Sequence, residues 1–429
     1  MWSWLGCGAH VKHRGWRHRV GAVSVMASIW LITSDARADD SSASIFSLSG
    51  FGTAGAVHSS EASADFTSGY LKPNGAGFSH DWSTDVDSLI AGQLRVQPVA
   101  ELSAVVQVIS EQLYDDTYRP HVEWANIKYQ PTADFSVRIG RTVLPSFMFS
   151  DTRKVGYANP WVRPPVEVYN LVPISNSDGI DLSYRLHLGG LVQTFAGTYG
   201  KSDPKLPSDV GGTAHGRQIW LLTDTIEYNA FSAHVAYQHV RLTVPGLNGV
   251  FEAMRQFGPQ GSALADRYAP VDKRAEFFSL GAQYNPGTWF VMGEWGETNY
   301  HSVLGAQAAG YVSGGYRVGP VTPYLTYSEV QAKSNTGDPG LPLAGLPPES
   351  AGTAMQLNAG LDALLAAVAD QRTLSAGARW DFVRHFDLKL QYDHSRLGAV
   401  SHGTLIDIQP GYRPGGTLNL LSATIDFVW

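Results

Sequence analysis

One short stretch of the sequence carries the residue types of a nucleophilic active site. Asp393, His394 and Ser395 are consecutive, and His402 follows seven residues after Ser395. A serine that passes its proton to a histidine oriented by a carboxylate can attack an acyl group. The chain has 14 histidines among 429 residues, however, so one such grouping is unsurprising. We therefore expect no catalytic residues and interpret the protein as a non-enzyme.

The glycines of the segment GFGTAG, from Gly50 to Gly55, have the spacing of a dinucleotide-binding turn. Such a turn needs a strand before it and a helix after it, because the helix N-terminus holds the pyrophosphate. No helical pattern follows Gly55. The segment is interpreted instead as a strand that needs small side chains, and neither a cofactor nor a metal is expected.

A second set of residues could act on ions rather than on bonds. It lies in a long connection that begins at Arg141 and ends at about Asn176. Its charged residues are Arg141, Asp151, Arg153, Lys154, Arg163 and Glu167. In a water-filled passage of low local dielectric, such charges decide which ions pass. The alternative is an external loop whose charges are solvated or lie at a contact between subunits.

The elements around these residues alternate with a period of two. From Leu421 to Trp429, apolar residues alternate with Ser422, Thr424 and Asp426. About 16 segments of roughly 8 to 11 residues have this pattern, which is the length of a tilted membrane strand. Helical periodicity is nearly absent, except for a short helix expected at residues 357–368. The fold class is therefore all-β, a transmembrane antiparallel up-and-down β-barrel of about 16 strands.

Short turns alternate with long connections along the chain. The tight turns are expected at residues 97–101, 130–134, 228–231, 285–288, 318–321 and 382–387. The longest connections between them are residues 141–176, 241–274 and 331–371. Short turns at a periplasmic rim and long loops at the other rim are typical of outer-membrane barrels. With both chain ends at the periplasmic rim, the number of strands is even.

Three basic residues fall on the polar, inward faces of neighbouring strands. Arg95, Lys128 and Arg138 belong to the second, fourth and fifth expected strands. As a basic wall opposite carboxylates such as Asp151 and Glu167, they would create a transverse field that favours polar solutes over apolar ones. Their closeness to the periplasmic turns leaves an alternative, in which they are ordinary solvated charges of the lumen.

The N-terminus has the features of a signal peptide. A basic region precedes the apolar run from Val20 to Ile32, and Ala36 and Ala38 form a small-x-small cleavage site. Cleavage removes the only cysteine, Cys7. It also removes five Lys/Arg and one Asp, which takes the formal net charge from −7 to −11. We therefore expect a signal peptide at residues 1–38, an acidic barrel at residues 39–429, and no affinity for nucleic acid.

The chain resembles the trimeric general porins of Gram-negative bacteria, including an uncharacterised proteobacterial subgroup. The signal peptide, the strand count, the turn alternation and the segments SDTRKVGY (residues 150–157) and WVRPPVEVY (residues 161–169) carry this resemblance. Phe427 and Trp429 resemble the assembly signal of outer-membrane barrels. The resemblance implies location in the cell outer membrane, a homotrimer, contacts with lipid and lipopolysaccharide, and assembly by the barrel-assembly machinery with periplasmic chaperones.

In porins, the connection after the fifth strand is the constriction loop, so the resemblance implies that residues 141–176 fold inward and narrow the pore. It also implies passive diffusion of small hydrophilic solutes and ions. One alternative is a substrate-specific channel for a small anionic or polar solute. Another is a structural or receptor barrel plugged by its long loops. The sequence has no P-loop and no coupling segment of an energised transporter, so transport is expected to be passive.

Overall fold

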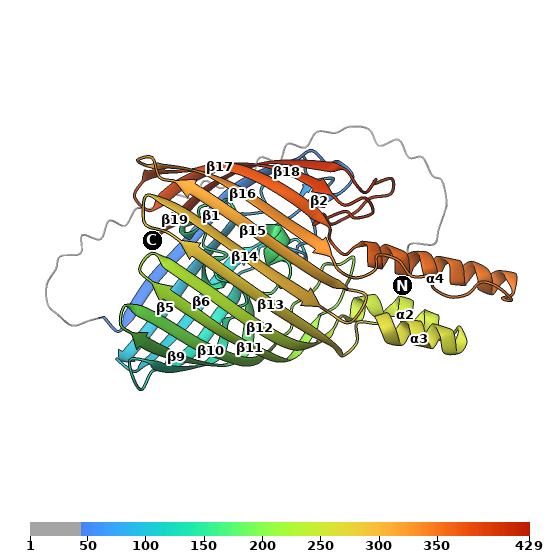
Figure 1. Ribbon diagram of the computed structural model, residues 1–429, viewed down its shortest axis with the longest axis horizontal. Helices are drawn as coiled ribbons and strands as arrows, with labels where there is room; N and C mark the ends of the chain where they lie inside the picture. The colour runs from blue at the N-terminus through green and yellow to red at the C-terminus, as the bar shows by residue number, and fades with distance from the viewer. Residues whose placement is uncertain (1–43) are drawn as a thin grey trace. The chain divides into compact units, whose positions relative to one another are not determined.

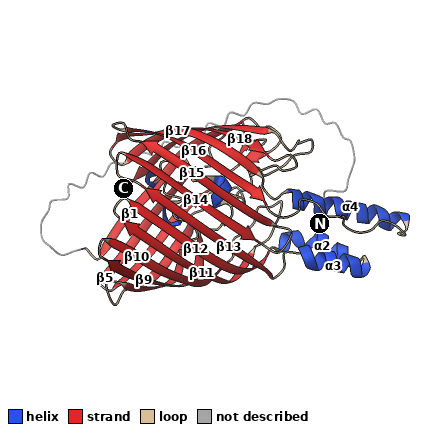
Figure 2. Cartoon of the chain, in the orientation of Figure 1, coloured by secondary structure: helices blue, strands red, loops and turns tan. Residues whose placement is uncertain are grey.

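The computed structural model describes residues 44–429. The predicted signal peptide, residues 1–38, lies outside the described residues, and so do residues 39–43. The described chain consists mainly of antiparallel strands, with few helices (Figure 2). Within this part of the chain, no helix has the length and apolar character needed to cross a membrane.

Sixteen long strands form one closed antiparallel sheet (Figure 1). They are β1 Phe46–Ser59, β5 Leu89–Val99, β6 Leu102–Glu111, β7 His121–Tyr129, β8 Phe135–Val143, β9 Asn176–Leu188, β10 Leu191–Ser202, β11 His215–Tyr228, β12 Phe231–Thr243, β13 Lys273–Tyr284, β14 Trp289–Asn299, β15 Ala306–Tyr316, β16 Val321–Ala332, β17 Gln371–Val383, β18 Phe386–Leu397 and β19 Thr417–Val428. β1 pairs with both β5 and β19, which closes the barrel. The predicted sixteen-stranded up-and-down barrel is confirmed.

Three short strands lie in the first loop, between β1 and β5. β2 (Asp65–Phe66) pairs with β3 (Ala76–Gly77), and β4 (Trp82–Ser83) pairs with the end of β1. These pairings fold the first loop back towards the barrel, and Asp65 also forms an isolated bridge with Ile406 of the eighth loop. The first and eighth loops therefore support each other at the rim.

The two faces of the strands differ as the alternation predicts. On β19, Leu421 and Ile425 are 46% and 42% exposed, whereas Thr424 and Asp426 are at most 1% exposed. Large exposed apolar side chains recur at alternate positions on the other strands. An apolar outer band and a polar inner face are what a barrel requires between lipid and water.

The seam between β1 and β19 explains two of the glycines in the GFGTAG segment. Gly50 lies against the indole of Trp429, and Gly52 lies against the ring of Phe427. A Cβ atom at Gly50 would come within 1.9 Å of Trp429, and one at Gly52 within 2.4 Å of Phe427. The segment is thus a strand that needs small side chains, as predicted, because the C-terminal aromatic rings cover it.

Helices of eight residues or more occur in two of the long loops. The fifth loop contains η3 Pro245–Leu247, α2 Asn248–Arg255 and α3 Gly258–Tyr268, and the seventh contains α4 Pro348–Ala366. These helices share an apolar cluster and extend past one rim of the barrel (Figure 1). The helix predicted in the seventh loop is confirmed. The helices of the fifth loop depart from the expectation of almost no helical pattern, because Gly258 and Pro259 interrupt their periodicity.

Candidate functional site

The third loop, residues 144–175, connects β8 to β9 and lies against the inner face of the barrel. It contains two 3-10 turns, η1 Ser150–Thr152 and η2 Gly156–Ala158, and one helical turn, α1 Val166–Tyr169. Pro164 and Pro165 precede α1 and restrict the entering backbone. All four residues of α1 are buried. The loop is therefore a packed internal element of the barrel.

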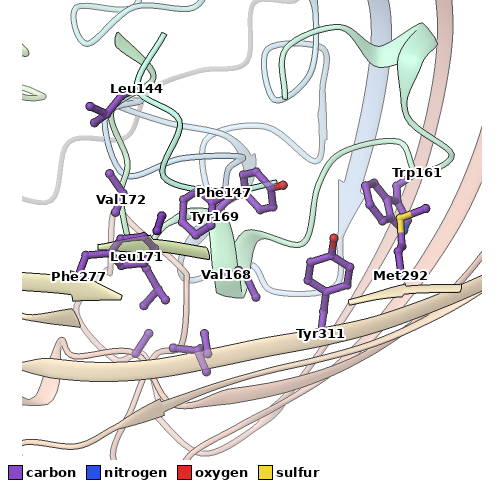
Figure 3. Close-up of a cluster of buried hydrophobic side chains, with 14 of the residues drawn as sticks. Leu144, Phe147, Trp161, Val168, Tyr169, Leu171, Val172, Phe277, Met292 and Tyr311 are labelled. Carbon is purple, nitrogen blue, oxygen red and sulfur yellow. The ribbon is translucent and has the colours of Figure 1, made fainter. Parts of the chain in front are cut away.

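An apolar cluster fastens the third loop to the wall (Figure 3). The loop contributes Leu144, Phe147, Trp161, Val168, Tyr169, Leu171 and Val172, and the wall contributes residues that include Ile219, Phe277, Met292 and Tyr311. Burying one such large apolar side chain contributes about 1.5 to 3 kcal/mol. The inner face is thus partly apolar where the loop packs on it, whereas the alternation predicted polar inward residues.

Trp161 combines this apolar packing with hydrogen bonds to the wall. Its side chain is 1% exposed and packs edge-on against Tyr311. Its indole N–H donates to Ser313 Oγ at 2.9 Å and to Thr326 Oγ1 at 3.2 Å. A buried indole N–H needs such a partner. The loop is consequently fixed in orientation as well as in position.

Glu294 of β14 is a buried acceptor for the third loop. It accepts hydrogen bonds from the Tyr169 hydroxyl at 2.7 Å, the Tyr311 hydroxyl at 3.0 Å and the Met148 backbone N–H at 2.7 Å. Its exposure is 4%. Buried carboxylates need this number of donors to offset their desolvation. Glu294 therefore joins two separate stretches of the loop to one strand.

Arg163 and Glu167 of the third loop are buried anchors rather than exposed pore charges. The Arg163 guanidinium donates to both carboxylate oxygens of Asp87, at 2.8 and 2.6 Å, and to Ser422 Oγ at 2.8 Å. Burial alone would lower the pKa of Arg163, but Asp87 outweighs this effect and raises it. The Glu167 carboxylate accepts hydrogen bonds from Ser328 and from Gln371 at 2.9 and 2.7 Å. Their exposures of 7% and 3% depart from the expectation that they line open water.

Two basic residues of the wall hold the backbone of the loop near η2. Lys389 Nζ donates to the Gly156 carbonyl at 2.6 Å and pairs with Asp426 at 2.9 Å. Arg379 donates to the carbonyl of Tyr157 at 2.6 Å. Lys389 is fully buried, so its ammonium requires these partners. The sequence analysis did not single out either residue.

The residues just before η2 are tied to another part of the wall. Lys154 Nζ lies 2.6 Å from Glu111 of β6 and 3.0 Å from Glu123 of β7. Burial lowers the pKa of Lys154, but the two glutamates outweigh this effect and raise it above its usual value. Arg153 lies over the Tyr169 ring and contacts the Val172 carbonyl at 3.4 Å. Lys154 and Arg153 therefore also act as tethers.

Asp151 differs from the other charged residues of the third loop because it is exposed. Partial loss of hydration raises the pKa of Asp151, and the nearby Arg138 opposes that shift. Arg138 lies directly opposite Lys128 across β7 and β8. Arg95 and Arg185 are exposed on the inner faces of β5 and β9. The expected basic residues therefore share one wall, to which the strand alternation adds Arg185.

No protein-family model matches the sequence, and no curated protein sequence matches it either. Solved barrels match the structure. A Salmonella typhi OmpF complex with daunomycin is 14% identical, with a TM-score of 0.53 over 90% of this chain and 97% of that one. The anion-selective porin of Comamonas acidovorans is 13% identical, with a TM-score of 0.52 over 90% and 99%. The chain has the fold of Gram-negative outer-membrane porins.

A third solved barrel agrees with this porin fold. The trimer form of in-vitro folded OmpT, an outer membrane protein of Vibrio cholerae, is 11% identical, with a TM-score of 0.50 over 90% of this chain and 99% of that one. At these identities the likeness concerns the fold alone. The roles of individual residues in this porin fold therefore rest on their own contacts.

Arg141 lies outside the lumen of the porin barrel. It belongs to β8, where Ile139 is 59% exposed on the outer face, and it forms a bidentate ion pair with Asp178 of β9 at 2.7 and 2.8 Å. Residues two apart on a strand share a face. This placement departs from the expectation of a constriction residue. Continuing the alternation of β8 past Gly140 would have indicated it.

The Ser/His/Asp grouping is divided between the two faces of the porin barrel. The Ser395 hydroxyl lies 2.7 Å from the Thr373 hydroxyl on the inner side, whereas the His394 ring lies 2.8 Å from Asn419 on the outer side. Asp393 faces inward and lies 3.7 Å from Arg163. A base on the opposite face of the strand cannot take the proton of Ser395.

Proposed function

We propose that the protein is an outer-membrane porin that lets small hydrophilic solutes and ions diffuse passively through a lumen narrowed by the third loop. The observation that carries this proposal is the unequal filling of the barrel. The third loop packs on the inner faces of β11 to β19 through the apolar cluster and the Arg163, Glu167 and Lys389 contacts, and Lys154 ties it to the ends of β6 and β7. The inner faces of β5 to β9 keep exposed charges.

The charges of that open side support a water-filled path. Arg95 and Arg185 are exposed, and Lys128 and Arg138 are partly exposed, so solvent reaches all four side chains. Lys128 and Arg138 are like charges in directly opposed positions, which costs stability in a sheet. Water lowers that cost because it screens the repulsion, and in a path for solutes the two charges would act on passing ions. Asp151 provides the carboxylate on the loop side of this passage.

A channel that prefers small anions is the second candidate. Four basic residues line the open wall, whereas Asp181, the carboxylate 3.4 Å from Arg138, is only 4% exposed. The charge along this wall is therefore positive, although the whole chain carries a formal net charge of −7. Local charges dominate because salt screens distant exposed charges within about 10 Å. Two kinds of channel would show anion preference. In a specific anion channel the current saturates as the concentration of one anion rises, whereas in a broad diffusion channel it does not.

The location and the assembly state belong to the same proposal. The apolar outer band and the C-terminal rings of Phe427 and Trp429 suit a lipid bilayer and barrel assembly. A signal peptide at residues 1–38, contacts with lipopolysaccharide and assembly by the outer-membrane machinery would follow. A homotrimer is supported by the trimer form of the Vibrio cholerae protein with the same fold. The protein is not proposed to be an enzyme.

Planar-bilayer recording of the refolded chain tests this function. Residues 39–429 are added at low protein concentration in symmetric salt, and a salt gradient is then imposed. Ohmic current steps in groups of three support a trimeric porin, and the reversal potential gives the ion preference. A current that saturates with one anion favours the specific channel. A correctly folded barrel without conductance would contradict both and favour a structural or receptor barrel that the third loop plugs.

A further inference from the structure

Three side chains converge inside the barrel near the ends of β6 and β7. Glu111 ends β6, and His121 and Glu123 lie at the start of β7. His121 Nε2 is 3.6 Å from Glu111 Oε1 and 3.7 Å from Glu123 Oε2. The three atoms lie within 4.8 Å of one another, and among the described residues this is the only such group of potential metal ligands.

The types and spacing of these atoms suit a borderline transition-metal ion. Zn²⁺ takes imidazole nitrogen and carboxylate oxygen at about 2.0 to 2.2 Å, in tetrahedral geometry. Two ligands at the corners of such a tetrahedron are about 3.4 Å apart. The separations of 3.6 and 3.7 Å from His121 Nε2 to the two carboxylates need only a small contraction to reach that value, and the two carboxylates lie within 4.8 Å of each other. Three protein ligands would leave a fourth position for water.

A cationic group already lies at this position. Lys154 Nζ contacts Glu111 Oε1 at 2.6 Å and Glu123 Oε2 at 3.0 Å. These are the same two oxygen atoms that face His121. The lysine therefore shows, independently of the histidine, that the carboxylates are arranged to bind a positive charge from the lumen.

The surroundings hold the ligands in place and leave a way in. Ser175 Oγ donates to Glu123 Oε1 at 2.6 Å, which turns Oε2 towards the cluster. Such outer contacts orient metal ligands and typically change affinity by about 10- to 100-fold. The His121 side chain is 31% exposed and Glu111 is 16% exposed, whereas Glu123 is 3% exposed. An ion in the lumen can reach the cluster from the histidine side.

We propose that Glu111, His121 and Glu123 form a site for a divalent transition-metal ion such as Zn²⁺, and that Lys154 competes with the metal for the two carboxylates. The ammonium and the metal need the same oxygen atoms, so they exclude each other. Metal binding releases Lys154, and with it one tether of the third loop to β6 and β7. The site thereby links metal concentration to the position of residues 150–156 in the lumen.

The test uses the refolded full barrel in detergent, with Co²⁺ as a spectroscopic substitute for Zn²⁺ and calorimetric titration with Zn²⁺. Lys154→Met removes the competitor, and Lys154→Met/His121→Gln also removes a ligand. His80→Gln, at an exposed histidine of the first loop, is the matched control. We expect Lys154→Met to bind one metal per chain about tenfold more tightly than the unsubstituted chain. The second variant should lose this gain, and His80→Gln should keep the affinity of the unsubstituted chain.

Equal affinities of Lys154→Met and Lys154→Met/His121→Gln would overturn the proposal, as would the absence of tetrahedral Co²⁺ absorption in Lys154→Met. Where Lys154→Met folds poorly, Zn²⁺ should restore its thermal stability, because a ligand that binds only the folded state stabilises it. Zn²⁺ should not restore the thermal stability of Lys154→Met/His121→Gln. The release of the third loop rests on the proposed function and has a separate readout, a Zn²⁺-dependent change in channel conductance that Lys154→Met lacks.

Discussion

Arg163 and Asp87 form a bidentate ion pair inside the barrel, with N–O distances of 2.8 and 2.6 Å and side-chain exposures of 6% and 5%. Asp87 lies at the end of the first loop, and Arg163 lies in the middle of the third. The pair connects two loops that are 76 residues apart in the sequence. It therefore decides where the third loop crosses the lumen, and its removal tests whether the loop narrows the pore.

Arg163→Met should destabilise the barrel and loosen the third loop. Removing one partner of a buried ion pair leaves the other charge uncompensated and costs about 3 to 5 kcal/mol. The free energy of unfolding, measured by tryptophan fluorescence in denaturant with the protein in lipid vesicles, should fall by this amount. Single-channel conductance should rise and become noisier, because Trp161 and α1 lose a neighbouring anchor.

The double variant Asp87→Asn/Arg163→Met is the control for the charge. It removes both ions, so it should recover part of the lost stability while the conductance remains high. A single variant that loses less than about 1 kcal/mol would match an exposed pair, which would contradict the burial of this one.

Ion preference should depend on the basic wall rather than on the net charge of the chain. Arg95→Ala and Arg185→Ala each remove an exposed lumenal charge, and a charge near a passing ion contributes about 1 kcal/mol or less in water. We expect each variant to shift the anion-to-cation permeability ratio towards cations by about two- to fivefold, measured as a reversal potential in a salt gradient. Arg372→Ala is the matched control, because Arg372 pairs with Glu329 on the outer face at 2.9 Å. An equal shift in the control would contradict the role of the wall.

The helices of the fifth and seventh loops should unfold while the barrel stays folded. Leu361 of α4 is fully buried among α2, α3 and α4, so Leu361→Ala should cost about 2 to 5 kcal/mol within that cluster. Limited proteolysis should then cut residues 245–270 and 340–366 faster, while the barrel stays resistant and the conductance is unchanged. Met355 is 59% exposed on the same helix, so Met355→Ala should leave the cleavage rate as it is. Loss of the barrel in Leu361→Ala would show that the helices support it.

The strands could be predicted from the sequence because lipid imposes a rule on every one of them. Each wall strand needs an apolar outer face, so its apolar residues recur with a period of two. β18 and β19 can therefore be recognised from their outward residues, which include Leu390, Tyr392, Leu421 and Ile425. The same rule, continued one residue past Gly140 on β8, would have placed Arg141 outside. The strand count followed from the same local signal, and the even number followed from placing both chain ends at one rim.

The contacts of the third loop could not be predicted in this way, because no repeating pattern in the sequence specifies them. Arg163 meets Ser422 across 259 positions and Glu167 meets Gln371 across 204, and no periodicity connects residues so far apart. A charged loop residue has the same sequence signature whether it is solvated or buried against a partner. One signal was available: Lys389 on the inner face of β18 and Asp426 on that of β19 are charges that a narrow lumen can bury.

Closure of the barrel should depend on the absence of a side chain at Gly50. The Gly50→Ala variant places a Cβ atom 1.9 Å from the indole of Trp429, so the indole must move off the seam between β1 and β19. Forcing an extra methyl group into a packed contact costs about 1 to 3 kcal/mol. We expect a lower yield of the heat-modifiable folded form on gels after refolding, together with faster unfolding.

Gly92→Ala is the matched control for this change. Gly92 lies directly opposite Gly50 on β5, on the same outer face, and a Cβ atom there meets nothing within 4 Å. Both substitutions reduce the flexibility of the unfolded chain in the same way, so a difference in folding yield reports the contact with Trp429. Removing the ring in Gly50→Ala/Trp429→Ala should abolish that difference. Equal yields for Gly50→Ala and Gly92→Ala would instead show that Trp429 adjusts freely and does not hold the seam.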